Sequence, residues 1–181
     1  MRPRWVEEVA PTPDEVRRRV VGDDLVPEAD VVMDRAFTVP APPDQVWPWL
    51  VQLGKDRAGW YLPRPVERFV PRSRRALRRV EPRWQGLAVG DVIPDYGGRE
   101  EWFRAEVVDP PTVLVYSSRR GRTDVSWAIS LTPSDGGTRV HLRLRLAPVR
   151  HRFLARTAGG LVDLLTIAGM AAGLRERVAG S

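Results

Sequence analysis

Cysteine is absent from this sequence of 181 residues, and lysine occurs only once, at Lys55. The lack of cysteine excludes disulfides, thiolate ligands for metals and cysteine nucleophiles. Lysine and arginine together number 29, so the other 28 basic residues are arginines, and the formal net charge is +6. A basic chain makes nucleic acid a partner to consider. An arginine-rich, lysine-poor composition is also typical of GC-rich coding, however, so the charge alone does not indicate such a partner.

Histidine is scarce, and its two positions do not suggest a metal site. His141 and His151 lie far in the sequence from any pair of carboxylates at ligand spacing. His141 alternates with arginines, which predicts a surface position, and for His151 we expect a solvated side chain at the start of a helix. No Ser-His-Asp arrangement is recognisable, and no glycine-rich loop has the lysine that nucleotide phosphates require. We expect no metal and no cofactor.

Long apolar runs are also lacking. The longest covers 161–174, contains Asp163 and is too short to span a bilayer, so it is typical of a buried core helix. The first ten residues have arginines but no apolar stretch of the kind found in secretory signals. Hydrophobic residues make up 43% of the chain, enough for one globular core. We therefore expect a cytoplasmic protein without a transmembrane segment.

The first thirty residues are predicted to form an arm ahead of the main domain. Thr12, Pro13 and Glu15 match a capping box with proline at the first helical position, which predicts a short helix over 13–20. Gly22 ends this helix. The expected organisation is an N-terminal arm over 1–30 and a ligand-binding domain over 31–181.

After the arm, turn residues and hydrophobic spacing predict one strand, two short helices, a run of strands and a long helix. The predicted strands are 31–39, 89–94, 101–108, 112–118, 125–132 and 138–147, and the predicted helices are 44–53, a piece within 65–80, and 151–178. Connections as short as those between the later strands join antiparallel neighbours. Pro48 is expected to bend or split the first of the helices.

Two of the strands alternate clearly between apolar and polar residues. The apolar sets are Val125, Trp127, Ile129 and Leu131, and Val140, Leu142, Leu144 and Leu146; the polar set is Arg139, His141, Arg143 and Arg145. This alternation predicts a sheet with one dry face and one face in water. The final helix is apolar nearly all the way round at its centre, so we expect it to be buried on most sides.

These patterns predict an α+β fold. A curved antiparallel sheet of six or seven strands wraps around the long C-terminal helix, and two short helices follow the first strand. The segment from Phe37 to Pro43, running into Val46-Trp47-Pro48-Trp49-Leu50, resembles the strand-to-helix junction of a bacterial branch of the START/Bet v 1-like helix-grip superfamily, also described as SRPBCC or polyketide cyclase/dehydrase-like. The resemblance implies a helix-grip fold, but its members range from lipid carriers to cyclases and receptors, so it indicates function only loosely.

Aromatic and apolar residues predicted near the space between sheet and helix are candidates for a ligand site. They are Trp60, Tyr61, Tyr116, Trp127, Ile167 and Met170. Aromatic rings give a ligand large contact area with few rotatable bonds. Polar groups on otherwise apolar faces, Arg35, Ser117 and Asp163, are candidates for orienting a ligand or moving a proton. The alternatives are that the rings fill the core and that the polar groups pair with one another, as Arg35 and Asp163 would.

An arginine run and a pair of glycines are candidates for contacts with partners. The run is Arg72, Arg74, Arg75, Arg78, Arg79 and Arg83; on a helix it would form a charged stripe, and a solvated face is the simpler interpretation. Because the run lacks interleaved aromatic residues, we expect no nucleic-acid partner. Gly169 and Gly173 share a helical face, which permits close packing against a neighbouring element or a contact in a homodimer.

The sequence favours binding of a small, mostly hydrophobic molecule between sheet and helix. An alternative is a cofactor-free polyketide cyclase or dehydratase that uses the same cavity, because holding a reactive chain in one shape needs few strong acids or bases. A second alternative is an interaction module that presents the arginine run to an acidic partner. The sequence does not decide whether the ligand is transformed.

Overall fold

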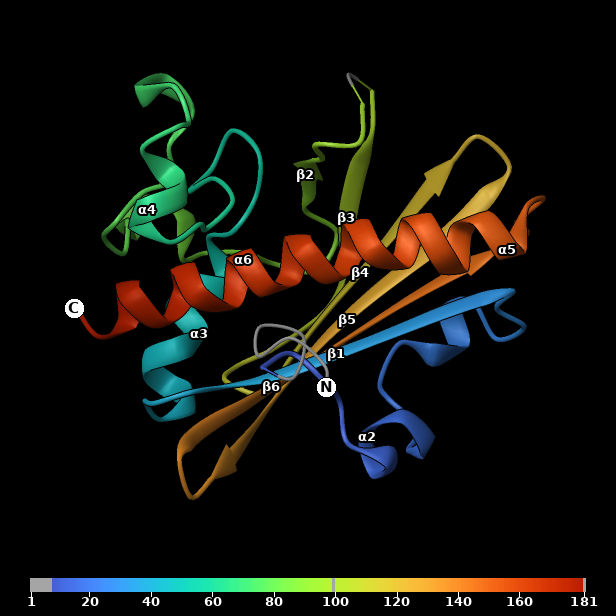
Figure 1. Cartoon of the computed structure of the whole chain (residues 1–181), viewed down its shortest axis with the longest axis horizontal. Helices are drawn as coiled ribbons and strands as arrows, with labels where there is room; N and C mark the ends of the chain where they lie inside the picture. The colour runs from blue at the N-terminus through green and yellow to red at the C-terminus, as the bar shows by residue number, and fades with distance from the viewer. Residues whose placement is uncertain (1–7, 99, 181) are drawn as a thin grey trace.

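The computed structural model describes residues 8–98 and 100–180, and its centre is one antiparallel sheet of six strands (Figure 1). The spatial order is β1-β6-β5-β4-β3-β2. The strands are β1 (Val31–Val39), β2 (Val92–Pro94), β3 (Trp102–Asp109), β4 (Val113–Arg120), β5 (Thr123–Ser134) and β6 (Gly137–Ala147). From β2 to β6, each strand pairs with the next one along the chain. β1 is the exception, because it pairs with β6, the last strand.

The C-terminal helix crosses one face of this sheet (Figure 1). It consists of α5 (Arg152–Leu154), a π-helical turn (Ala155–Gly159) and α6 (Gly160–Val178). Ile167, Met170 and Leu174 are buried against the sheet and its loops. The predicted fold class, a curved antiparallel sheet with a long helix packed against it, is therefore confirmed.

The first half of this helix differs from the prediction, because its outer side is uncovered. Five large apolar residues there are exposed: Phe153, Leu154, Leu161, Val162 and Leu165. Over 152–178 the helix is long and apolar enough, by length and composition alone, to cross a membrane. Only 28% of its most apolar stretch is buried inside the protein. The expectation that it is buried on most sides holds only for the half that begins at Ile167.

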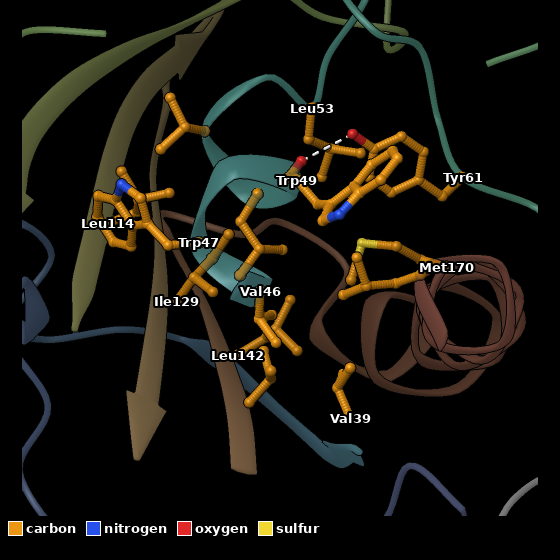
Figure 2. Packing of buried hydrophobic residues seen from close by; sticks show 14 of the residues in the cluster. Val39, Val46, Trp47, Trp49, Leu53, Tyr61, Leu114, Ile129, Leu142 and Met170 are labelled. Carbon is orange, nitrogen blue, oxygen red and sulfur yellow. Dashed lines mark hydrogen bonds between the residues drawn. The ribbon is translucent and has the colours of Figure 1, made fainter. Parts of the chain in front are cut away.

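Two short helices follow β1, as predicted. α3 (Pro43–Val51) continues through Pro48 without splitting, and α4 (Arg64–Glu67) is a single turn. The core lies between α3, α6 and the concave face of the sheet, where Trp49, Met170, Ile129 and Leu142 meet (Figure 2). α3 thus closes one end of the space under the helix.

The arm covers the opposite, convex face of the sheet. α2 (Pro13–Arg17) begins with the predicted capping box, in which the Thr12 hydroxyl accepts from the Glu15 amide and the Glu15 carboxylate accepts from the Thr12 amide. Farther along, Val20 packs on Val115 and Ala128. Residues 1–7 of the predicted arm lie outside the described residues, and the division of the chain at residue 31 stays a prediction.

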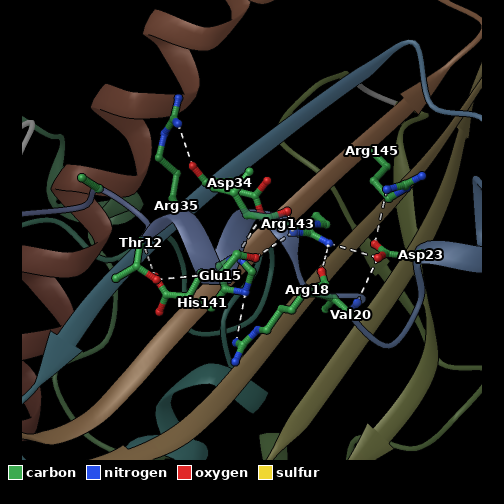
Figure 3. A network of polar contacts seen from close by, with 12 residues as sticks. Thr12, Glu15, Arg18, Val20, Asp23, Asp34, Arg35, His141, Arg143 and Arg145 are labelled. Atoms are coloured by element: carbon green, nitrogen blue, oxygen red, sulfur yellow. Dashed lines mark hydrogen bonds and ion pairs between the residues drawn. The ribbon is translucent and has the colours of Figure 1, made fainter.

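Because the arm lies there, the prediction of a face in water is wrong for β6. His141 and Arg143 are only 1% and 3% exposed. Asp34 on β1 lies 2.8 Å from both the His141 Nε2 and the Arg143 Nε (Figure 3). The arm adds Glu15, which pairs with Arg139. The alternation identified correctly which side chains share a face, but it carries no information on what covers that face.

Candidate functional site

Four aromatic rings gather on the concave face, between the sheet and the C-terminal helix. Trp127 on β5 lies at their centre, stacked on Tyr116 of β4 at 5.9 Å and on Trp60 at 6.2 Å between ring centroids. Phe103 of β3 lies 5.8 Å from Trp127 and 6.1 Å from Tyr116. We call Trp60, Phe103, Tyr116 and Trp127 the aromatic cluster. Three of its members come from neighbouring strands and one from a loop.

The loop that carries Trp60 is tightly folded. Gly54 and Gly59 pair in an isolated antiparallel β-bridge. Gly59 has φ 85°, and a Cβ on this residue would come within 2.9 Å of the Ala76 Cα. A glycine is required at such a position. The Trp60 indole nitrogen donates to the Thr166 carbonyl on α6 at 3.4 Å. Trp60 is thereby placed between the helix and Trp127.

The aromatic cluster lines a cavity of about 40 Å³. Leu50, Leu53, Ile93 and Ile129 complete its apolar wall, and Lys55, Asp95 and Tyr96 add polar groups. Tyr96 is 55% exposed, so this polar part is the side that meets solvent. Sites for drug-sized ligands usually measure about 300–1,000 Å³. In this conformation the rings therefore occupy most of the space that a ligand of that size would need.

Charged groups sit beside the cluster at the end of β4. Arg120 pairs with Asp95, and its Nε lies 3.8 Å from Glu101. The guanidinium also lies 5.2 Å from the centre of the Phe103 ring, within the range of a cation–π contact. With Lys55, two positive groups stand against the two carboxylates, so the solvent side of the cavity is polar without a strong net charge.

Tyr116 and Ser117 are neighbours on β4, and their side chains point to opposite faces of the sheet. Tyr116 faces the cavity, and burial raises the pKa of its phenol although the nearby Arg57 opposes this shift. At neutral pH the phenol is therefore protonated and able to donate a hydrogen bond. The Ser117 hydroxyl instead donates to Glu106 at 2.5 Å, and Glu106 does not line the cavity. Of the two candidates on this strand, only Tyr116 points inward.

Three other predicted wall residues lie in the core rather than at the cavity. Tyr61 is fully buried, donates from its hydroxyl to the Trp49 carbonyl at 2.7 Å and accepts from Gln52 (Figure 2). Ile167 and Met170 are buried in the same core and do not line the cavity. The structure thus brings Trp60, Tyr116 and Trp127 together and leaves Tyr61, Ile167 and Met170 as packing residues in this conformation.

The polar candidates Arg35 and Asp163 form an ion pair. The Arg35 Nε lies 3.0 Å from an Asp163 oxygen, and another Arg35 nitrogen donates to the Gly160 carbonyl at 3.0 Å. Burial raises the pKa of Asp163, while the charge of Arg35 acts in the opposite direction. The pair ties β1 to the start of α6, and neither residue lines the cavity.

Phe103 and Ile93 were missed at the sequence level, although both line the cavity. Phe103 and Ala105 alternate with Arg104 and Glu106 in the sequence, so the strand phase could have indicated that Phe103 faces inward. Ile93 lies on a strand of only three residues, where no alternation can be read. Within 8–98 and 100–180, no three His, Asp or Glu side chains lie together in a way that could hold a metal ion.

The arginine run does not form the helical stripe that was one of its two interpretations. Its residues lie in a 3₁₀ turn (Arg72–Arg74), an extended segment and a second 3₁₀ turn (Pro82–Trp84), not on one helix. Arg78 pairs with Glu67 and Glu176, and Arg79 pairs with Glu81. The prolines at 71 and 82 explain the difference, because each interrupts the helical pattern.

No family model matches this sequence, and no curated protein matches it. Several solved structures are similar in fold. Protein MLL2253 from Mesorhizobium loti is 17% identical with a TM-score of 0.51, over 83% of this chain and 98% of that one. Protein CV1439 from Chromobacterium violaceum is 16% identical with a TM-score of 0.52, over 81% and 96%. A Rhodobacter sphaeroides protein is 17% identical with a TM-score of 0.52, over 85% and 95%. At these identities the likeness shows the shared fold alone.

Proposed function

We propose that this helix-grip domain binds a small, flat and mostly apolar molecule at the aromatic cluster. The observation that carries the proposal is the convergence of Trp60, Phe103, Tyr116 and Trp127 on one cavity under the helix. Aromatic walls with a few polar groups at one end are typical of ligand sites. The sequence resemblance to the helix-grip superfamily supports the same function.

Binding requires one ring to move, since the cavity of about 40 Å³ holds only a few atoms. Trp60 is the ring best suited to this, because it sits on a loop and the hydrogen bond from its indole nitrogen to Thr166 is long, at 3.4 Å. Phe103, Tyr116 and Trp127 are each fixed to a paired strand. A ligand that replaces Trp60 against Trp127 would keep the stacking and enlarge the space.

The test is the binding of 1-naphthol, a flat apolar probe, by the full chain and by Trp127→Ala. We expect Trp127→Ala to weaken binding by about tenfold or more, because the central ring of the cluster is lost. Trp102→Ala is the matched control, since the alternation along β3 directs Trp102 away from the face that Phe103 shares with the cavity. Equal weakening in both variants, or none in either, would contradict the proposed site.

Catalysis remains the alternative for the same cavity, and Tyr116 is the observation that favours it. Its protonated phenol faces the aromatic cluster and can donate a hydrogen bond to a carbonyl oxygen. An enzyme of the cyclase or dehydratase kind should lose about a hundredfold in turnover on Tyr116→Phe while ligand binding persists. A carrier should bind its ligand almost unchanged in this variant.

The arginine run has no part in the proposed site. Arg78 and Arg79 pair with glutamates, and the residues of the run do not lie on one helix. A cytoplasmic location and a homodimer stay part of the sequence-based hypothesis.

The identity of the natural ligand can be sought by native mass spectrometry of the protein purified from its own host, because the mass of a retained molecule would be measured directly.

A further inference from the structure

The exposed side of the C-terminal helix carries a row of large apolar residues. We call Phe153, Leu154, Leu161, Val162 and Leu165 the outer apolar face; each is more than half exposed, and Phe153 reaches 82%. Single exposed apolar residues are ordinary, whereas a contiguous set marks an interaction surface. In Figure 1 this half of the helix lies in front of the sheet, and no described element covers it from that side.

The five residues lie along the exposed first half of the helix. On α6, Leu161 and Leu165 are four positions apart and form one row, with Val162 beside it. Phe153 and Leu154 precede the π-helical turn, so they do not continue this row by regular α-helical spacing, but both are exposed. Thr157 and Ala158 fill the gap between the two groups, and both are exposed as well. The face is therefore continuous over about three and a half turns of helix.

The exposed charges at the beginning of this face are positive, and the nearby carboxylates of Asp30 and Asp163 are mostly buried. Arg150, Arg152 and Arg156 are exposed at its beginning; Arg152 pairs with Asp30, and Arg156 donates to the Asp30 backbone carbonyl. The only acidic residue within 150–166 is Asp163, which is turned toward Arg35 and mostly buried. An apolar surface flanked by arginines is complementary to lipid with anionic headgroups.

We propose that the outer apolar face docks on the surface of an anionic bilayer, with the helix in the plane of the interface. The thirteen residues from Phe153 to Leu165 measure about 20 Å, less than the roughly 30 Å of a bilayer core. The rest of the helix cannot supply the missing length, because Ile167, Met170 and Leu174 are buried under the sheet. The helix thus lies on the membrane rather than crossing it, and this inference goes beyond ligand binding.

The experiment is cosedimentation of the full chain with vesicles of equal parts phosphatidylcholine and phosphatidylglycerol, and with vesicles of phosphatidylcholine alone. We expect binding to the mixed vesicles that weakens with added salt. The double variant Phe153→Ser and Leu161→Ser should lower this binding by about tenfold or more, because it removes apolar area from the interface. Phe69→Ser is the matched control, since Phe69 is 78% exposed and lies outside the helix.

A second pair of variants tests the charges. Arg150→Gln with Arg156→Gln should weaken binding to the mixed vesicles several-fold, whereas Arg72→Gln with Arg74→Gln removes the same charge elsewhere and should not. Circular dichroism of each variant checks that the fold is retained, since all the substituted residues are exposed.

Three results would overturn the proposal. The first is equal binding to both kinds of vesicle, and the second is equal loss of binding in the Phe69 control. The third is a dimer in analytical ultracentrifugation that the Phe153 and Leu161 variant converts to a monomer while vesicles are not bound. In that third case the face joins two copies of this chain instead of meeting lipid.

Discussion

Asp34 is the residue on which the buried charges of the convex face depend. Its carboxylate accepts from the Arg143 Nε and lies 2.8 Å from the His141 Nε2 (Figure 3). Arg143 also donates to Asp23 at 3.0 Å and to three backbone carbonyls of the arm. A buried guanidinium is tolerated only when its donors are satisfied, and here strand and arm satisfy them jointly.

We predict that Asp34→Ala lowers the free energy of unfolding by about 3–5 kcal/mol, because it removes the carboxylate that the buried Arg143 Nε and His141 Nε2 share. Urea denaturation followed by circular dichroism measures this change. Asp14→Asn is the matched control: its side chain is 91% exposed and pairs with Arg17 in solvent, so the expected change is within about 0.5 kcal/mol. Similar effects of the two substitutions would show that the network contributes little.

The pKa of Glu15 leads to a pH-dependent prediction. Burial raises this pKa, but hydrogen bonds from Arg139 and from the Thr12 amide, together with the charge of Arg139, lower it to about 2 from an ordinary value of 4.5. A carboxyl with a lower pKa in the folded state adds stability above pH 4.5 that is lost as the pH falls toward 2. The wild type should therefore lose more stability over this window than Glu15→Gln. Parallel curves of unfolding free energy against pH for the two proteins would contradict the assignment.

At the scale of residues, sequence patterns predicted which side chains share a face but not what lies against them. Trp127 was correctly expected on the concave side, because strand alternation has a fixed period of two. Tyr116 and Ser117 were both candidates, and only Tyr116 faces the cavity. His141 was expected in water and is buried, because its cover comes from an arm more than a hundred residues earlier. Tyr61 follows Trp60 directly, yet one ring enters the core and the other the cavity, which depends on the fold of their loop.

Within α6, the two glycines that share a face have different surroundings. A Cβ on Gly173 would lie within 2.6–2.8 Å of three backbone atoms of Leu62, whereas a Cβ on Gly169 would meet only the end of the Leu62 side chain, at 3.0 Å. The small residues thus allow the segment after Tyr61 to pack directly on the helix. Of the two uses that the sequence left open, close packing within the chain is the one that the structure shows.

We predict that Gly173→Ala costs about 1–3 kcal/mol of unfolding free energy, because backbone atoms of Leu62 cannot move aside as a side chain can. Gly169→Ala is the control: a shift of the Leu62 side chain accommodates the methyl group, and alanine's better helix propensity offsets part of the strain. Thermal unfolding of the two variants gives the comparison. An equal loss in both would mean that the helix shifts as a body, and the close approach would not be the cause.

The elements themselves were the best predicted part of the molecule, for reasons that also explain the errors. The first strand was predicted over 31–39 and is found there, because prolines and a clear alternation bound it. The helical piece within 65–80 shrank to the single turn of α4, since prolines interrupt it. The burial of the long helix was overestimated because periodicity reports how apolar a helix is, not how much of it its own chain can cover.

The whole molecule consists of one sheet with different covers on its two faces. The concave face has a conventional apolar cover in α3 and α6, and the convex face of β6 has the arm, held by ion pairs and by Val20 on Val115. Gly22 shows how close this contact is, because a Cβ there would come within 2.5 Å of a Val115 methyl group. The described part of the arm therefore packs directly on the sheet.

We predict that a chain beginning at Val31 fails to unfold cooperatively, because removal of the arm leaves three arginines on one face of β6 without Glu15 and Asp23. Repulsion among these charges and the newly exposed Val115 both favour the unfolded state. Near-ultraviolet circular dichroism and urea denaturation of the truncated chain would show lost tertiary packing and a broad transition. The variant Glu15→Ala in the full chain removes one counter-charge and leaves the apolar contact, so it should keep a cooperative transition at a lower urea midpoint. A truncated chain that unfolds sharply at the full-length midpoint would instead establish 31–181 as an independent domain, with the arm only resting on it.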